Sequence, residues 1–474
     1  MNTKLPSLFL VLFFALHFCN AQELIIKKGI VVDSINVKGT PEETFALFLP
    51  ENFENKGTWP LLVVIDEKGR GKKSLSTFSE AGKDKGYIMA ASNAVNDSLS
   101  ITENVQRMGR LFASLSALFP LNNNRVYVGG FDAGGRLANL MPIFFKNLNG
   151  VISCGANFSN TELVDSKNPF HFIGIVGLED FDYINLRDNE AFFNKLKFDN
   201  NILLHEGGKV WPPKRQLSKA LDYLKLRSMA KVYTEMDSIF IQGVLTESLN
   251  DVKTLISTNK FLLAHRELKE IQNAFRVLIN TDSIENAIRE LKRDKNYRSQ
   301  KRKHEDALFK EVFLKEDYQY YLDEDVRTFN YNNLGWWKYQ IEELQKLDKG
   351  ESIEQQKMAK RLAGYVNALI DDAIDFNQLK EEGKQDDEAL LFLNMLKTIT
   401  SPDTTDSYLR VISLSAKYED FGTAIFYLEE LLKKGFTDRD RLYKLSNTAL
   451  LRITPEFNEV VEKYLKSARY EIKE

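Results

Sequence analysis

The residues best suited to chemistry lie in one short segment, Gly130-Phe131-Asp132-Ala133-Gly134. A buried-strand pattern precedes it at 125–128, and a helical pattern follows from Arg136 to Lys146. Glycines in a Gly-x-X-x-Gly turn between strand and helix leave room for a strained middle residue whose side chain is presented as a nucleophile. That residue is usually Ser. Here it is Asp132. The turn is therefore of the expected type, but its central residue is not the one that acyl transfer needs.

Two later segments also follow predicted strands. They read Gly177-Leu-Glu-Asp-Phe-Asp-Tyr183 and Gly207-Gly-Lys-Val-Trp-Pro-Pro213. Together with the Gly130 to Gly134 turn, called the elbow below, they resemble α/β hydrolases of the secreted esterase and depolymerase kind. The whole chain is similar to bacterial secreted proteins that join such a domain to tetratricopeptide-like repeats.

The resemblance implies a role for three positions. Asp132 stands where the family has its catalytic Ser, Asp180 where it has the acid, and Lys209 where it has the His. The place of the His-Gly oxyanion-hole motif is taken by a loop that reads Asp66, Glu67, Lys68 and Gly69. We therefore expect an inactive triad and a vestigial pocket.

The chemistry of these residue types supports that expectation. A lysine with a pKa near ~10.4 is protonated at neutral pH and accepts no proton from a nucleophile. The charge of Asp132 would oppose a developing oxyanion. A carboxylate facing an ammonium predicts an Asp132–Lys209 ion pair, with Asp180 as a second acceptor.

Two alternatives keep the site functional. Haloalkane dehalogenases and epoxide hydrolases use Asp at this elbow, but they need a His, and His205 lies four residues before position 209. We expect His205 to pack within the sheet. Gathered carboxylates can also bind Ca²⁺, yet Lys68 and Arg136 are available to neutralise them. We therefore expect neither a metal nor a cofactor.

The surrounding pattern alternates strands and helices up to about residue 228. It begins with a half-exposed hairpin at 24–53 and continues with fully apolar runs such as Leu61 to Ile65. This predicts a doubly wound, mostly parallel sheet over residues 22–228, and the resemblance implies that it is α/β hydrolase-like.

Residues 229–474 carry amphipathic helical patterns and predict an all-α, tetratricopeptide-like domain. The pair Tyr408 to Lys417 and Gly422 to Lys434 is the clearest repeat, and an irregular bundle is the alternative. Trp336-Trp337 is expected in the core. The basic run Arg289 to Lys303 is interrupted by acids and is expected to be solvated helix and loop.

Composition limits the location and partners of the protein. Residues 1–21 have the charged, apolar and small-residue regions of a signal peptide, which predicts a secreted or periplasmic protein. Phe18 disfavours lipidation at Cys19. Beyond the signal, Cys154 is the only cysteine. A net charge of −3 gives no reason to expect nucleic acid, and no transmembrane segment is expected.

The functional prediction is a secreted, non-catalytic hydrolase-like protein that binds a small molecule, or a protein partner along its helical array. The alternative is a divergent extracellular hydrolase of a carboxylic ester or polysaccharide-linked ester that depends on Asp132.

Overall fold

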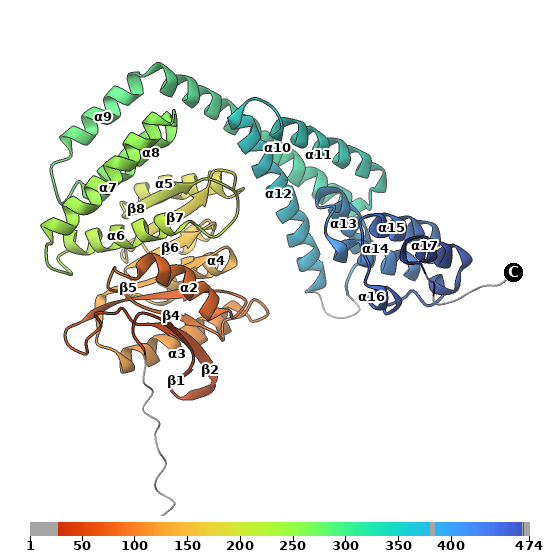
Figure 1. Ribbon diagram of the computed structural model, residues 1–474, viewed down its shortest axis with the longest axis horizontal. Helices are drawn as coiled ribbons and strands as arrows, with labels where there is room; N and C mark the ends of the chain where they lie inside the picture. The colour runs from red at the N-terminus through yellow and green to blue at the C-terminus, as the bar shows by residue number, and fades with distance from the viewer. Residues whose placement is uncertain (1–26, 380–383, 467, 469–474) are drawn as a thin grey trace, which may run out of the picture. The chain divides into compact units, whose positions relative to one another are not determined.

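The computed structural model describes residues 27–379, 384–466 and 468 (Figure 1). The expected signal peptide and Cys19 lie outside these residues. The chain forms two compact units, one ending at Val128 and the other beginning at Gly129. The domain boundary expected at residues 228–229 stays a prediction.

The unit that ends at Val128 combines a hairpin with buried parallel strands. Its elements are β1 (Val31–Val37), β2 (Thr40–Phe48), β3 (Trp59–Ile65), α2 (Gly71–Gly82), β4 (Ile88–Ser92) and α3 (Ile101–Leu118). Strands β1 and β2 pair antiparallel, as the alternating pattern predicts, and β3 pairs parallel with β4. Helix α3 begins with a capping box between Ser100 and Glu103.

Strands continue to alternate with helices up to Ala230. The elements are β5 (Leu121–Phe131), α4 (Ala133–Phe144), β6 (Gly150–Cys154), β7 (His171–Gly177), α5 (Tyr183–Lys195), β8 (Asn200–His205) and α6 (Lys214–Ala230). Strands β6, β7 and β8 pair parallel. Helix α4 begins three residues earlier than the sequence pattern indicates, because it follows directly on the elbow residue.

The strands form one eight-stranded sheet with the order β1-β2-β4-β3-β5-β6-β7-β8. It is parallel in β3/β4, β6/β7 and β7/β8, and antiparallel where the hairpin joins it. The predicted α/β-hydrolase fold class, followed by a large all-helical region, is confirmed.

The helical region follows α6. Its helices are α7 (Ser238–Ser257), α8 (Phe261–Phe275), α9 (Asp282–Arg293), α10 (Lys295–Thr328), α11 (Leu334–Asp348), α12 (Ile353–Gln378), α13 (Asp387–Thr400), α14 (Thr405–Lys417), α15 (Phe421–Lys433), α16 (Arg439–Tyr443) and α17 (Pro455–Leu465). From α13 to α15 each helix packs on its successor. Whether this is a true repeat stays a prediction. The basic run Arg289 to Lys303, expected to be solvated helix and loop, covers the end of α9, a link at Asp294 and the start of the 34-residue α10, and most of it is exposed.

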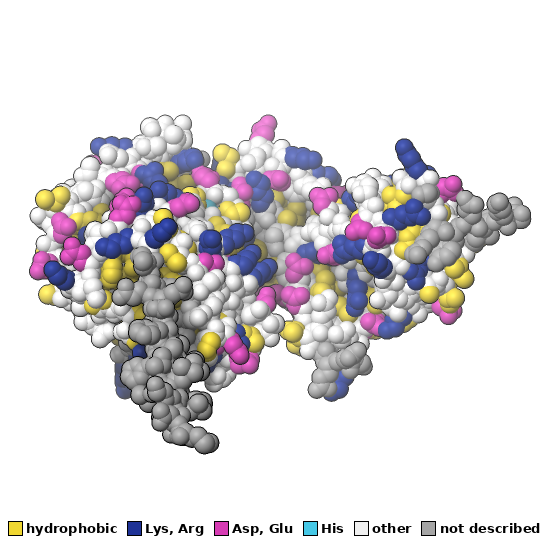
Figure 2. All heavy atoms as spheres, turned by 60° about the horizontal axis from the view of Figure 1, so that its bottom comes forward, with side chains coloured by type: hydrophobic (Ala, Val, Ile, Leu, Met, Phe, Trp, Pro, Cys, Tyr) yellow, Lys and Arg dark blue, Asp and Glu magenta, His cyan; other side chains and the backbone are white. Residues whose placement is uncertain are grey.

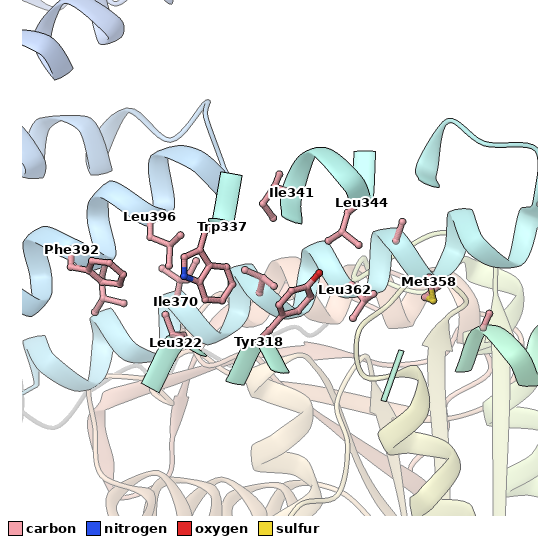
Figure 3. Close-up of a cluster of buried hydrophobic side chains, with 14 residues drawn as sticks. Tyr318, Leu322, Trp337, Ile341, Leu344, Met358, Leu362, Ile370, Phe392 and Leu396 are labelled. Carbon is pink, nitrogen blue, oxygen red and sulfur yellow. The ribbon is translucent and has the colours of Figure 1, made fainter. Parts of the chain in front are cut away.

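A buried cluster holds helices α10 to α13 together (Figure 3). Trp337 is fully buried, and its Nε1 donates a hydrogen bond of 2.9 Å to the Asp325 carboxylate. Its ring lies 5.8 Å from that of Tyr318, centroid to centroid. The predicted core role of Trp337 is therefore confirmed.

No helix in the described ranges is both long and apolar enough to cross a bilayer. On the face shown in Figure 2, basic and acidic side chains are interspersed, in keeping with the nearly balanced composition.

A buried guanidinium ties the helices to the loop after β7. Arg361 of α12 and Glu311 of α10 are both 0% exposed, and Arg361 donates to the Glu311 Oε2 at 2.8 and 2.6 Å. The Arg361 Nη1 donates to the Leu178 carbonyl at 2.7 Å. Lys315 of α10 adds a 2.9 Å bond to the Phe181 carbonyl. The two helices therefore fix the backbone of residues 178–181.

Arg361→Met should destabilise the protein by about 3–5 kcal/mol, because it removes both hydrogen bonds to the buried Glu311 carboxylate and leaves it only the Lys315 ammonium, 3.3 Å away. Lys360→Met is the matched control. The Lys360–Glu179 pair spans 2.9 Å but is 42% and 26% exposed, so its loss should cost under about 1 kcal/mol. Urea unfolding at pH 7 measures both. Equal costs would show that the buried pair does not fix this loop.

Candidate functional site

The elbow keeps the strained geometry that its glycines predict. Asp132 lies between β5 and α4 with φ 52° and ψ −123°, a backbone state that costs a non-glycine residue about 1–3 kcal/mol. A Cβ added to Gly130 would lie 2.4 Å from the Gly134 carbonyl oxygen, so a side chain there would collide with the turn. The Asp132 side chain does not cap α4 and is free to point elsewhere.

That side chain meets Lys209. The Lys209 Nζ lies 2.9 Å from the Asp132 Oδ1 and 3.0 Å from the Asp182 Oδ2. The predicted Asp132–Lys209 ion pair is therefore present. The side chains of Asp132, Lys209 and Asp182 are 37%, 17% and 4% exposed. Lys209 therefore links a partly exposed carboxylate, Asp132, to a buried one, Asp182.

The second acceptor of the Lys209 ammonium is Asp182. The sequence predicts Asp180 in this role, and that prediction is wrong. The Oδ1 of Asp180 accepts a hydrogen bond of 2.9 Å from the backbone N–H of Asp182. This local turn engages Asp180 with the backbone and leaves the Asp182 carboxylate for the ammonium. The expectation failed because two acids two residues apart share one loop, and spacing alone does not decide which of them turns toward Lys209.

The environment keeps Lys209 charged. Burial acts to lower the pKa of its ammonium, but Asp182 and Asp132 outweigh burial and raise that pKa. The ammonium also lies 4.1 Å from the centre of the Phe181 ring, a cation–π distance. Lys209 therefore stays protonated at neutral pH and cannot accept a proton from a nucleophile.

At Asp180 the environment favours the neutral form. Its side chain is almost completely buried, and burial raises the pKa of its carboxyl from 3.8 to about 6, although Lys209 partly opposes the change.

Aromatic packing supports the two motifs that carry the site. Trp211 of the last-strand loop stacks on Phe131 of the elbow, with centroids 4.9 Å apart and planes 29° apart. The sequence placed both residues in motifs but gave no sign of their contact. It also gave no sign that Phe181 would lie under Lys209.

The loop expected to replace the oxyanion hole is internally bonded. Asp66 is buried, accepts a 2.9 Å hydrogen bond from the Lys68 N–H, and pairs with Arg70 at 3.1 Å. Gly69 has φ 64°, and a Cβ there would lie 2.8 Å from the Asn93 carbonyl oxygen. The role of this loop, with Glu67, as a wall of a vestigial pocket stays a prediction.

His205 is buried at the end of β8, and its Nδ1 lies 2.8 Å from the Glu206 carbonyl oxygen. Burial lowers the pKa of its imidazole. The expected packing role is confirmed.

No family model and no curated protein matches this chain. Three of the solved structures that do match are Est1E from Butyrivibrio proteoclasticus, S-formylglutathione hydrolase from Staphylococcus aureus and esterase B from Lactobacillus rhamnosis. They are 11%, 11% and 15% identical to this chain, with TM-scores of 0.35, 0.34 and 0.35. The matches cover 42%, 42% and 43% of this chain and 100%, 99% and 89% of the others. At these identities and TM-scores the likeness carries no argument about this chain.

Lys209→Met should destabilise the protein by about 2 kcal/mol, because it leaves the buried Asp182 without its cation. This cost is smaller than for a fully buried ion pair, because Asp132 is partly exposed to solvent. The matched control is Arg136→Met, which removes an exposed 3.3 Å pair with the same Asp132 and should cost under about 1 kcal/mol. A double-mutant cycle with Asp132→Asn measures the coupling. Additive effects of the two changes would contradict a direct ion pair.

Asp180→Asn should remove a pH dependence of stability. With its pKa near 6 in the folded state and 3.8 as the usual value, folded wild type holds a proton between pH 4 and 6 that the unfolded chain has released. Wild-type stability should therefore fall as pH rises through this window. The variant should be about 3 kcal/mol more stable than wild type at pH 7, and similar to it at pH 4. Parallel stability profiles from urea unfolding would refute the assignment.

Proposed function

We propose that this chain is a secreted, catalytically silent protein of hydrolase fold that acts by binding a ligand or a protein partner. One observation carries the proposal: the Lys209 ammonium lies within 3.0 Å of both Asp132 and Asp182. The position of the family's base is thus occupied by a cation that pairs with the position of its nucleophile. Neither residue can carry out the proton transfer that serine-dependent acyl transfer needs.

A second candidate is a divergent hydrolase in which Asp132 attacks the substrate. Two observations favour it. The elbow keeps its strained backbone although Ser is absent, and Asp180 has a pKa near 6, which suits a proton acceptor. The solved structures named above are esterases and hydrolases, in keeping with this candidate, but a likeness of fold says nothing about turnover.

Turnover of short-chain aryl esters separates the two candidates. The purified chain from residue 22 should show no saturable turnover, and its rate should equal that of Asp132→Ala. Saturable turnover that Asp132→Ala abolishes would establish the second candidate and overturn the first.

The double variant Asp132→Ser, Lys209→His gives a further test. It should recover weak activity at most, because the Asp66 to Gly69 loop lacks the His-Gly motif and loss of an oxyanion-hole donor costs roughly 10²–10³ in rate. Rates equal to those of an ordinary esterase would show that this loop still forms a competent oxyanion hole.

A further inference from the structure

A cavity of about 600 Å³ lies within the unit that begins at Gly129, lined by residues of β8, α5, α8, α10 and α12. Its volume falls in the range of small-molecule sites. Asp132, Asp182 and Lys209 are not among the residues that line it. It is therefore distinct from the elbow site.

The lining combines an apolar wall with an excess of positive charge. Leu204, Leu262 and Ile353 supply part of the apolar surface. Seven Lys and Arg side chains line the cavity against four Glu side chains. Lys269 and Lys303 form no ion pair with a carboxylate in the described part of the chain, and both are exposed. The cavity thus offers positive charge that the protein itself does not neutralise.

An imidazole among these cations has an unused nitrogen. The Nε2 of His265 is buried and makes no hydrogen bond to any described residue. Its ring packs on Tyr297, with centroids 4.8 Å apart. Burial, together with Lys269 and other nearby cations, lowers the pKa of His265 to about 4. The ring is therefore neutral at physiological pH, and its Nε2 can donate to an anion when it carries the proton.

Part of the cavity lining is held in place by hydrogen bonds within the protein. The Tyr183 hydroxyl lies 3.1 Å from the His304 Nε2, and the His304 Nδ1 lies 2.6 Å from the Glu354 carboxylate. All three residues line the cavity. They come from α5, α10 and α12, so this hydrogen-bonded chain fixes three helices around the space. A preformed wall lowers the entropic cost of binding a ligand.

We propose that this cavity binds an organic anion with an apolar body, whose charged head lies at Lys269, Lys301 and the His265 Nε2. Lys269 is four residues after His265 on α8, so both face the same side of that helix. Lys301 of α10 also lines the cavity, and its Glu305 partner, 3.0 Å away on the same helix, is exposed. The inference deepens the proposed binding function and rests on it.

Titration calorimetry on the chain from residue 22 tests the proposal with four probes below their micellar concentrations: dodecanoate, dodecyl phosphate, dodecyltrimethylammonium and inorganic phosphate. At least one of the two anionic amphiphiles should bind saturably with one site per chain. The cationic amphiphile and inorganic phosphate should bind at least tenfold more weakly. The better of the anionic probes identifies the head group as carboxylate or phosphate.

Lys269→Glu should weaken binding of the anionic probe at least tenfold. Lys310→Glu is the matched control, since it reverses an exposed charge on α10 outside the cavity, and it should change the affinity less than twofold. Equal binding of the cationic amphiphile, an unchanged affinity in Lys269→Glu, or no saturable binding of either anion would overturn the assignment. Ester turnover separates the two proposals. If the protein neither hydrolyses esters nor binds the anions, only the proposal for the cavity is refuted. If it binds an anion and also shows turnover that depends on Asp132, only the proposal of a catalytically silent site is refuted.

Discussion

The contact on which much of this architecture depends is the buried ion pair between Arg361 and Glu311. A guanidinium withdrawn from water is stable only when its donors are satisfied, and Arg361 achieves this by bonding to Glu311 and to the Leu178 carbonyl. This constraint fixes α10 and α12 against the loop that follows β7. The helical region is therefore held to the loop after β7, which also carries Asp180 and Asp182.

The same loop explains the electrostatics of the elbow. Asp180 and Asp182 are nearly buried, and Asp132 adds a third carboxylate beside them. Lys209 offsets this negative charge by lying between Asp132 and Asp182, and the Phe181 ring supports the ammonium from one side. Asp180, which bonds to the backbone, responds through a raised pKa. Lys209 thus pairs directly with two of the three acids, and Arg136 adds an exposed pair with Asp132.

Much of the fold could be predicted because its signals are local. The apolar run Leu61 to Ile65 and the glycines around Asp132 identify a buried strand and a strained turn without any knowledge of their neighbours. The Asp132–Lys209 pair could be predicted because the two motifs had to meet. The choice of Asp182 over Asp180, the Phe181 ring beneath Lys209 and the burial of Arg361 could not, because they depend on side-chain directions and long-range packing. Helix α10 was missed in part because its polar sequence lacks a clear apolar stripe.

The Asp132–Lys209 ion pair also constrains the order in which its two residues could have been acquired. Consider a chain with Ser and His at positions 132 and 209, as the family resemblance implies for active relatives. A change to Asp132 alone would add a carboxylate next to two buried acids, with only the exposed Arg136 as a cation beside it. A change to Lys209 alone would find Asp182 already in place, 3.0 Å from its ammonium. The lysine is thus the substitution that the fold accepts first, and the aspartate becomes acceptable only afterwards, which makes the effect of one mutation conditional on the other.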